Sequence, residues 1–150
     1  MTRFRPEVRQ LIDGMSLSQV QAPDDALASV RLEVAREHLD SARAARSAQR
    51  FNAARSAYYE SIWYALQAML ASFGLRLEAR NEEGQHAVLM RFGRAELRDN
   101  ADEVDAAAML DGYRNERNQQ MYRHPTDTGL GMLPKHADVV VSAVSSRLGD

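Results

Sequence analysis

The sequence has no cysteine among its 150 residues, and three kinds of chemistry are thereby excluded. Disulfide bonds, zinc sites built from thiolates and a cysteine nucleophile all require that residue. Glycine and proline are also scarce, at 8 and 4 residues, whereas alanine and leucine are common. A sheet of many strands would need more turns and more β-branched residues. The composition therefore favours an all-α fold.

Long apolar stretches are missing as well. No segment approaches the ~18 consecutive apolar residues that a membrane-spanning helix needs, so we expect no contact with a membrane. The N-terminal stretch MTRFRPEVRQLIDG carries charges throughout and lacks the continuous apolar region of a secretory signal. The cytoplasm is therefore the expected location.

Lysine is nearly absent, because Lys135 is the single lysine among 19 basic residues and the rest are arginines. A net charge of −2 gives the whole molecule no attraction for nucleic acid. A biased genome composition is the simpler explanation of so many arginines. Arginine is also the better residue for forked contacts to phosphate, so a local binding cleft stays open as an alternative.

Apolar residues recur at helical spacing along most of the chain. We predict helices over about 6–15, 26–47, 50–73, 81–92, 101–123 and 134–148. Asp24 and Asp25 favour the start of the second helix, Gly74 favours the end of the third, and Asn81 can cap the fourth. Pro125 bounds the fifth, because the residue before a proline is pushed out of the α region.

The third predicted helix indicates the architecture. Its apolar stripe is widened by Tyr59, Trp63 and Met69 toward an all-round apolar surface, which is typical of the central helix of a bundle. Five to six helices joined by short loops make an all-α helical bundle. We assign residues 23–150 to this bundle domain and residues 1–22 to an N-terminal helical extension.

The four histidines do not form a metal signature. His38, His86, His124 and His136 are not paired at the close spacing of a helical metal site, and no neighbouring carboxylates complete one. His38 lies among charged residues and is expected in solvent, whereas His86 and His136 are expected to cap or pack helices. There is also no phosphate-binding loop, dinucleotide fingerprint or nucleophile elbow. We therefore expect no metal and no cofactor.

One segment, residues 113–125, is rich in arginine, asparagine, glutamine and tyrosine and poor in aliphatic residues. Arg117 and His124 are seven residues apart, which places them on one face of a helix, about 10 Å apart along its axis. Arg114 falls on the same side. Such a pair could converge on one phosphodiester. Spacing alone favours a simpler explanation, a solvated last turn with His124 near the negative end of the helix dipole.

This segment resembles the motif of HEPN domains, in which an arginine, usually followed by asparagine, precedes a histidine near a helix end. Arg117-Asn118 and His124, with six residues between, fit the outer limit of that pattern. Upstream, ARSAYYESIWYALQAMLASFGLR resembles the HEPN helix with a paired-aromatic start and a Leu-x-x-x-Gly-Leu end. His86-Ala87-Val88-Leu89 resembles the start of that family's next helix, together with Phe92. The resemblance covers roughly residues 50–125.

The resemblance implies a HEPN-type, metal-independent endoribonuclease that acts on RNA as a homodimer, in a toxin–antitoxin pair or another defence system. His124 would then exchange protons at the ribose 2′-hydroxyl or the leaving 5′-oxygen, and Arg117 would stabilise the charged transition state. The substrate-binding residues would be Arg114, Asn118, Tyr122 and Arg123.

Two other interpretations stay open. Many HEPN members have histidine five residues after the arginine, where this chain has Tyr122. Branches with tyrosine at that position include proteins thought to bind rather than cleave. This chain would then be a non-catalytic helical protein that partners a nucleotidyltransferase, an antitoxin or another component. The third interpretation is a purely structural dimeric bundle, whose polar motif only satisfies hydrogen bonds at a helix end.

Overall fold

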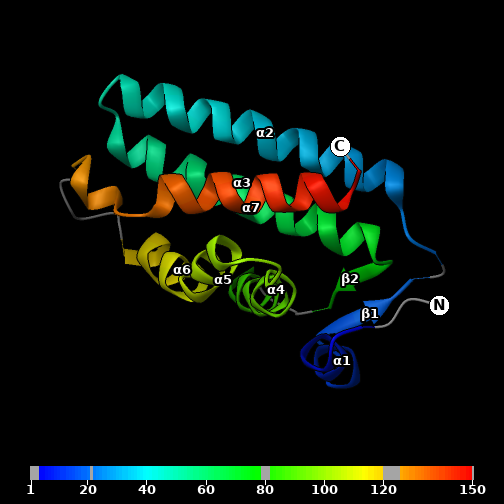
Figure 1. The fold of residues 1–150 in the computed structure, drawn as a ribbon. Helices are drawn as coiled ribbons and strands as arrows, with labels where there is room; N and C mark the ends of the chain where they lie inside the picture. Colours follow the sequence, from blue (N-terminus) through cyan, green and yellow to red (C-terminus); the bar gives the residue numbers. More distant parts are fainter. Residues whose placement is uncertain (1–3, 21, 79–81, 120–125, 150) are drawn as a thin grey trace.

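The computed structural model describes residues 4–20, 22–78, 82–119 and 126–149 (Figure 1). The helices are α1 (Pro6–Asp13), α2 (Asp25–Ser47), α3 (Phe51–Ser72), α4 (Glu82–Glu96), α5 (Ala101–Ala108), α6 (Leu110–Gln119) and α7 (Leu133–Arg147), with a short 3-10 helix, η2 (Thr128–Leu130). Two short strands, β1 (Leu17–Gln19) and β2 (Leu75–Leu77), accompany them. The predicted all-α helical bundle is confirmed.

The longest helices, α2 and α3, run antiparallel and side by side, and α7 packs along α3 (Figure 1). The shorter helices α4 and α6 contact α3 from the other side, and α5 contacts α7. Because α3 has neighbours around most of its circumference, it buries residues on more than one face: Ala54, Tyr58, Tyr59, Ile62, Ala65, Leu66, Met69 and Leu70 among them. Its predicted place at the centre of the bundle is confirmed.

A glycine lets three helices meet in this core. A Cβ built on Gly93 of α4 would lie 2.9 Å from both methyl carbons of Leu66 and 3.0 Å from Cδ1 of Leu110. Leu66 belongs to α3 and Leu110 begins α6. The missing side chain therefore allows α4 to approach both helices more closely than alanine would permit.

The chain after residue 100 forms two helices, where the sequence predicts one. The Met109 N–H bonds to the carbonyl oxygen of Ala106, three residues back, so the α-helical pattern is interrupted between α5 and α6. Buried residues continue at helical spacing across the break, which is why periodicity alone did not reveal it. The predicted continuation of this helix over 120–123 lies outside the described residues.

The sequence predicts no regular element between the third and fourth helices, but residues 75–77 form a strand. β2 pairs antiparallel with β1, with Leu17 opposite Leu77 and Gln19 opposite Leu75. Gly74 has a φ of +70° and turns the chain from α3 into β2, as a glycine after a helix commonly does. The strand pairing joins residues that are 56 to 60 positions apart, so no local pattern predicted it.

The N-terminal segment packs into the core of the bundle. Val8 and Leu11 of α1 and Leu17 of β1 are buried in the same apolar cluster as residues of α3 and α4. The chain from residue 4 to residue 20 therefore shares its hydrophobic core with the rest of the described structure.

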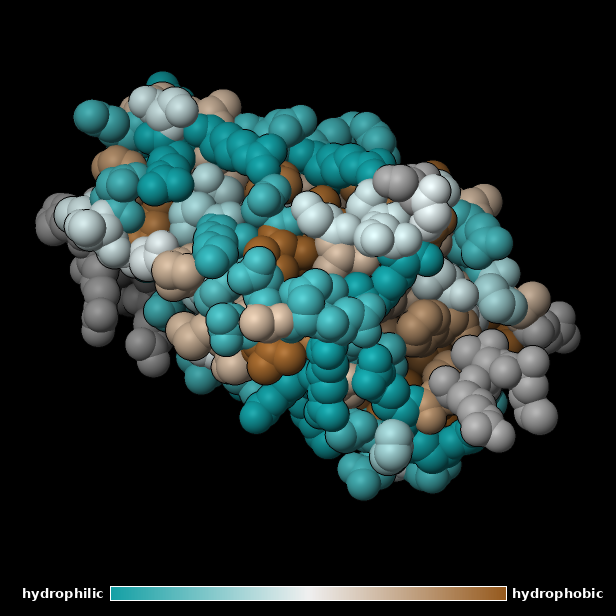
Figure 2. Space-filling view, viewed as in Figure 1, coloured by the Kyte–Doolittle hydropathy of each residue, from teal (hydrophilic) through white to brown (hydrophobic). Residues whose placement is uncertain are grey.

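The outer surface is mainly polar on the face that Figure 2 shows, with apolar surface visible between the helices and beside β2. Large apolar side chains are exposed on several elements: Met15, Val20, Leu27, Val30, Val104, Met109 and Met132. Within the described residues, no helix combines the length and the apolar content that crossing a bilayer requires.

A buried carboxylate connects α5 to α7. Arg147 donates a hydrogen bond of 2.6 Å to Glu103, whose residue is 5% exposed. The Glu103 backbone N–H donates to the Asn100 side chain at 2.9 Å, and the Asn100 amide donates back to Glu103 at 3.2 Å. The two residues thus cap the start of α5 reciprocally. The helix start predicted after Asn100 is confirmed.

Replacing Arg147 with methionine should lower the free energy of unfolding by about 3 kcal/mol, because Glu103 would keep a buried charge without its cation. Urea denaturation measures the loss. Lys135→Met is the matched control, since its pair with Asp102 is exposed on both sides (58% and 66%) and such pairs contribute ~1 kcal/mol or less. Equal losses in the two variants would show that the buried pair is not the source of the stability.

Candidate nucleic-acid interface at the end of α6

A buried tyrosine fixes the orientation of α6. Tyr113 is buried, and its hydroxyl group forms a hydrogen bond with Nδ1 of His136 on α7. Burial raises the pKa of Tyr113, whereas burial and the charge of Lys135 lower the pKa of His136. Both side chains are therefore neutral at pH 7, as a buried polar contact between helices requires. The expected packing role of His136 is confirmed.

The same orientation directs Arg114 and Arg117 toward α3. These two residues lie three positions apart and share one face of α6. The guanidinium carbon of Arg117 is 5.5 Å from the centre of the Tyr59 ring, which is cation–π distance. Nε of Arg114 lies 3.8 Å from the Asp111 carboxylate and is buried without a hydrogen-bond partner among the described residues. The cationic side chains of Arg114 and Arg117 thus lie toward the C-terminal end of α6.

Tyr59 links Arg117 to a buried histidine on α4. Its hydroxyl oxygen lies 2.7 Å from Nδ1 of His86, and the His86 ring packs against Trp63 with ring centres 4.0 Å apart. Burial raises the pKa of the Tyr59 phenol, while the charge of Arg117 acts in the opposite direction. The phenol therefore keeps its proton at neutral pH. His86 is confirmed as a packing residue.

A second group of arginines holds the chain that leads into α7. Arg46 of α2 donates to Asp127 at 2.7 Å, and Arg55 of α3 donates to the carbonyl oxygen of Gly129 at 3.0 Å. The Gly129 N–H donates to the hydroxyl of Thr126 at 3.0 Å. The Arg46 guanidinium also lowers the pKa of Asp127, which stays ionised at neutral pH. These contacts fix residues 126–129 against the end of the α2–α3 hairpin.

Arg43, Arg46 and Arg50 recur at spacings of three and four, which would place all three on one face of α2 if the helix continued through Arg50. Arg43 pairs with Asp138 of α7 at 2.7 Å, and Arg46 pairs with Asp127. Arg50 lies beyond the end of α2, at the position that precedes α3, because the helix ends at Ser47. The shared face therefore holds two of the three arginines, and both are paired with acidic side chains.

The residues predicted for the site fall into two groups. The structure describes Arg114 and Arg117 and brings both near Tyr59. Asn118 lies on α6, but its side chain is outside the described part of the chain. Tyr122, Arg123 and His124 lie in 120–125, which is also outside it. The predicted proximity of Arg117 and His124 therefore stays a prediction.

Sequence reasoning assigned Tyr59 only to the core and missed its contact with Arg117. The available signal was a hydroxyl-bearing aromatic residue in an otherwise apolar stripe, because a buried tyrosine usually needs a polar partner. His38 requires a correction as well. It was expected in solvent among charged neighbours, but its half-buried ring stacks on Tyr64 with centres 5.2 Å apart.

The chemistry that this end of α6 can supply is cationic. Among the residues that the structure describes, no three His, Asp or Glu side chains gather as a metal ion would require. Arg114 and Arg117 can instead bind an anion, and arginine is well suited to phosphate. No protein-family model, curated protein or solved structure matches this chain. The resemblance to HEPN domains therefore rests on the motif residues and their order.

Replacing Tyr59 with phenylalanine should lower the free energy of unfolding by about 1–2 kcal/mol, because Nδ1 of His86 loses the hydroxyl it contacts in a buried place. Replacement with leucine should destabilise further, since it also removes the ring beneath Arg117. Urea denaturation gives the free energies of unfolding. The NMR chemical shift of the Arg117 side-chain Nε–H shows whether an aromatic ring lies beside the guanidinium.

That Arg117 signal should move strongly in Tyr59→Leu and only slightly in Tyr59→Phe, because phenylalanine keeps the aromatic face. Tyr64→Phe is the control, since Tyr64 is half-buried and stacks on His38 instead. An Arg117 signal that is the same in wild type and Tyr59→Leu would mean that the cation does not lie on this ring in solution.

Proposed function

We propose that this protein binds RNA and cleaves it as a metal-independent endoribonuclease of the HEPN type, acting as a homodimer. The observation that carries the proposal is the placement of Arg117 over the Tyr59 ring, with Arg114 on the same face of α6. An arginine already held by an aromatic ring loses little freedom when it meets a phosphate. The end of α6 thus offers a preorganised cation in the part of the sequence that resembles the HEPN motif.

The proposed reaction requires one proton-transfer group and one cation. The ribose 2′-hydroxyl attacks the adjacent phosphorus and the bond to the 5′-oxygen breaks, which leaves a 2′,3′-cyclic phosphate and a 5′-hydroxyl. His124 takes the proton from the nucleophile or gives one to the leaving oxygen. Arg117 stabilises the negative charge of the phosphorane-like transition state. The nucleophile belongs to the substrate itself, so its positioning is already intramolecular.

The remaining motif residues would hold the substrate backbone. Arg114 and Arg123 contribute phosphate contacts, which weaken as salt rises because bound counterions are released when RNA binds. Asn118 and Tyr122 contribute hydrogen bonds to the sugar and phosphate or orient the histidine. A toxin or another defence component is the biological role that such an activity fits.

A second candidate function is binding without cleavage. The observation that favours it is the pairing of nearby arginines within the chain, because Arg43, Arg46 and Arg55 already contact Asp138, Asp127 and Gly129. Arginines engaged in this way are less available to phosphate. The end of α6 would then dock a nucleotidyltransferase or an antitoxin, and Arg117 would stabilise the fold through Tyr59.

His124→Ala and Arg117→Ala should each reduce RNA cleavage by a factor of ~10²–10⁴, the range typical of a lost general acid or base. The assay follows a labelled RNA in the presence of a chelator, and the products should end in a 2′,3′-cyclic phosphate or the 3′-phosphate formed from it. His38→Ala and Arg91→Ala are matched controls. Arg91 is exposed on α4, and both controls should cleave at the wild-type rate.

The results separate the two candidate functions. Cleavage that survives unchanged in His124→Ala would refute the ribonuclease. A wild-type protein that cuts no RNA but binds the product of a neighbouring gene through the end of α6 would support the second function. In that case Arg117→Ala should weaken the complex, whereas Arg91→Ala should not.

The proposed cleft forms between two subunits. Apolar side chains are exposed next to α6. Val104 and Ala108 lie one turn apart on α5, and Met109 lies at the junction of α5 with α6. A two-fold interface brings the same patch of each subunit together, so a small apolar patch can contact its own copy. We assign the patch of Val104, Ala108 and Met109 to the dimer interface.

Sedimentation equilibrium at micromolar concentration should therefore give twice the mass of one chain. Met109→Glu should shift the protein to the monomer and reduce cleavage with it, because a charge would then be buried in the interface. Val30→Glu is the control, since Val30 is equally apolar and exposed on α2. A monomeric wild-type protein, or a dimer that Met109→Glu leaves intact, would exclude this interface.

A further inference from the structure

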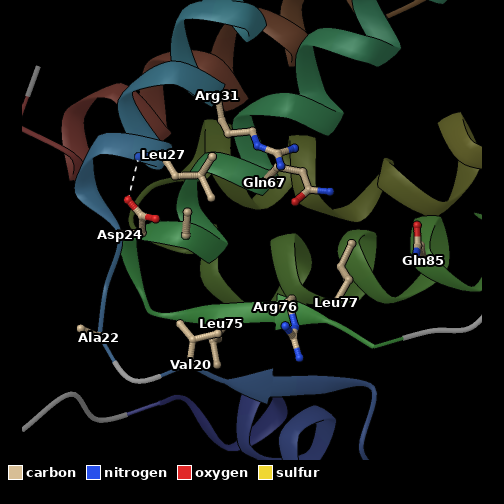
Figure 3. Close-up of a pocket in the computed structure, with 11 residues that line it drawn as sticks. Val20, Ala22, Asp24, Leu27, Arg31, Gln67, Leu75, Arg76, Leu77 and Gln85 are labelled. Carbon is tan, nitrogen blue, oxygen red and sulfur yellow. Dashed lines mark hydrogen bonds between the residues drawn. The ribbon is translucent and has the colours of Figure 1, made fainter.

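A cavity of about 440 Å³ lies between the start of α2, the last turns of α3 and strand β2 (Figure 3). Its volume falls in the range of small-molecule sites, which are mostly apolar and carry a few polar groups. Gln67, which lines the cavity, is eight residues beyond Tyr59 on α3, or about 12 Å along the helix. The cavity is therefore distinct from the arginine site at the end of α6.

The apolar part of the lining comes from three side chains. Leu75 and Leu77 are two positions apart on β2 and share one side of the strand. Leu27 of α2 faces the same cavity and is 39% exposed. Figure 3 shows Leu27 extending from α2 above the cavity and Leu77 pointing up from β2. All three side chains therefore offer apolar surface that a small apolar group can contact.

Charged side chains also line the cavity, and two of them are already engaged. Asp24 accepts a hydrogen bond of 2.9 Å from the Leu27 N–H and caps α2. Arg76 pairs with Glu78 at 2.8 Å. Arg31, by contrast, makes no hydrogen bond or ion pair with any residue that the structure describes. One positive charge is therefore left to meet a ligand.

The remaining polar groups are side-chain amides. Gln67 of α3 and Gln85 of α4 line the cavity, and an amide can both donate and accept hydrogen bonds. Figure 3 shows the Gln67 and Arg31 side chains extending from neighbouring helices on the same side of the cavity. A guanidinium with an amide near it suits a planar carboxylate, which accepts two parallel hydrogen bonds from arginine.

We propose that this cavity binds a small organic monocarboxylate, with its carboxylate on Arg31 and its apolar body against Leu27, Leu75 and Leu77. Arg31, which has no ion-pair partner among the described residues, balances one negative charge. A phosphate monoester would bring close to two charges, and the Asp24 carboxylate in the same lining would oppose the second. None of the residues assigned to RNA cleavage takes part in this site, so carboxylate binding can be tested independently of that function.

NMR titration of the full-length protein tests the site with 3-phenylpropionate as the probe and the neutral 3-phenylpropanamide as its isostere. The acid should shift the backbone amide signals of Leu27, Leu75 and Leu77 saturably at millimolar concentration. The neutral amide should bind at least about tenfold more weakly, because it cannot form the charge-assisted pair with Arg31. This comparison uses the wild-type protein alone and does not depend on a variant that folds.

Arg31→Gln should lower the affinity for 3-phenylpropionate by at least about tenfold and leave the weak binding of the neutral amide unchanged. Arg43→Gln, on the same helix but paired with Asp138, is the matched control and should bind the acid as the wild type does. Equal affinities for acid and amide would overturn the proposal, and so would full binding in Arg31→Gln. Absence of saturable shifts, or inorganic phosphate binding as tightly as the acid, would overturn it as well.

Discussion

α3 is buried around most of its circumference, and the neighbouring helices are arranged to cover it. α2, α7, α4 and α6 all contact it, so the side chains that face these helices must fit an occupied space. Gly93 meets that demand by leaving out a side chain where α4 crosses Leu66. The buried hydroxyl of Tyr59 requires a polar partner inside the core, and Nδ1 of His86 provides it.

Those buried polar contacts determine how the surface helices are oriented. A hydrophobic face alone tolerates small rotations, whereas a hydrogen bond between two buried side chains allows one arrangement. The bond from Tyr113 to His136 fixes α6 against α7, and the contact of Tyr59 with His86 fixes the ring that Arg117 covers. The candidate site is therefore a consequence of core packing: its arginine takes its position from a ring that belongs to the core.

The arginines of this protein have different roles, which depend on the residues that each one contacts. Arg147 neutralises the buried Glu103 and holds two helices together. Arg46 and Arg55 bind the chain that enters α7. Arg117 rests on an aromatic face, and Arg31 lines a cavity without a described partner. The surroundings of each arginine therefore decide whether it holds helices together, fixes a loop or lines a candidate binding site.

Features that depend on neighbouring residues could be predicted from the amino-acid sequence. Helical periodicity located the helices, and Asp24, Gly74 and Asn100 marked ends that the structure confirms, since caps and helical hydrogen bonds join residues about three to four positions apart. The motif residues Arg114 and Arg117 were also visible there. The pairing of individual arginines, the pairing of β1 with β2 and the position of Arg117 over the Tyr59 ring became visible only in the folded chain. Arg46 and Asp127 are 81 positions apart, and such contacts follow from how whole helices pack, which no local pattern encodes.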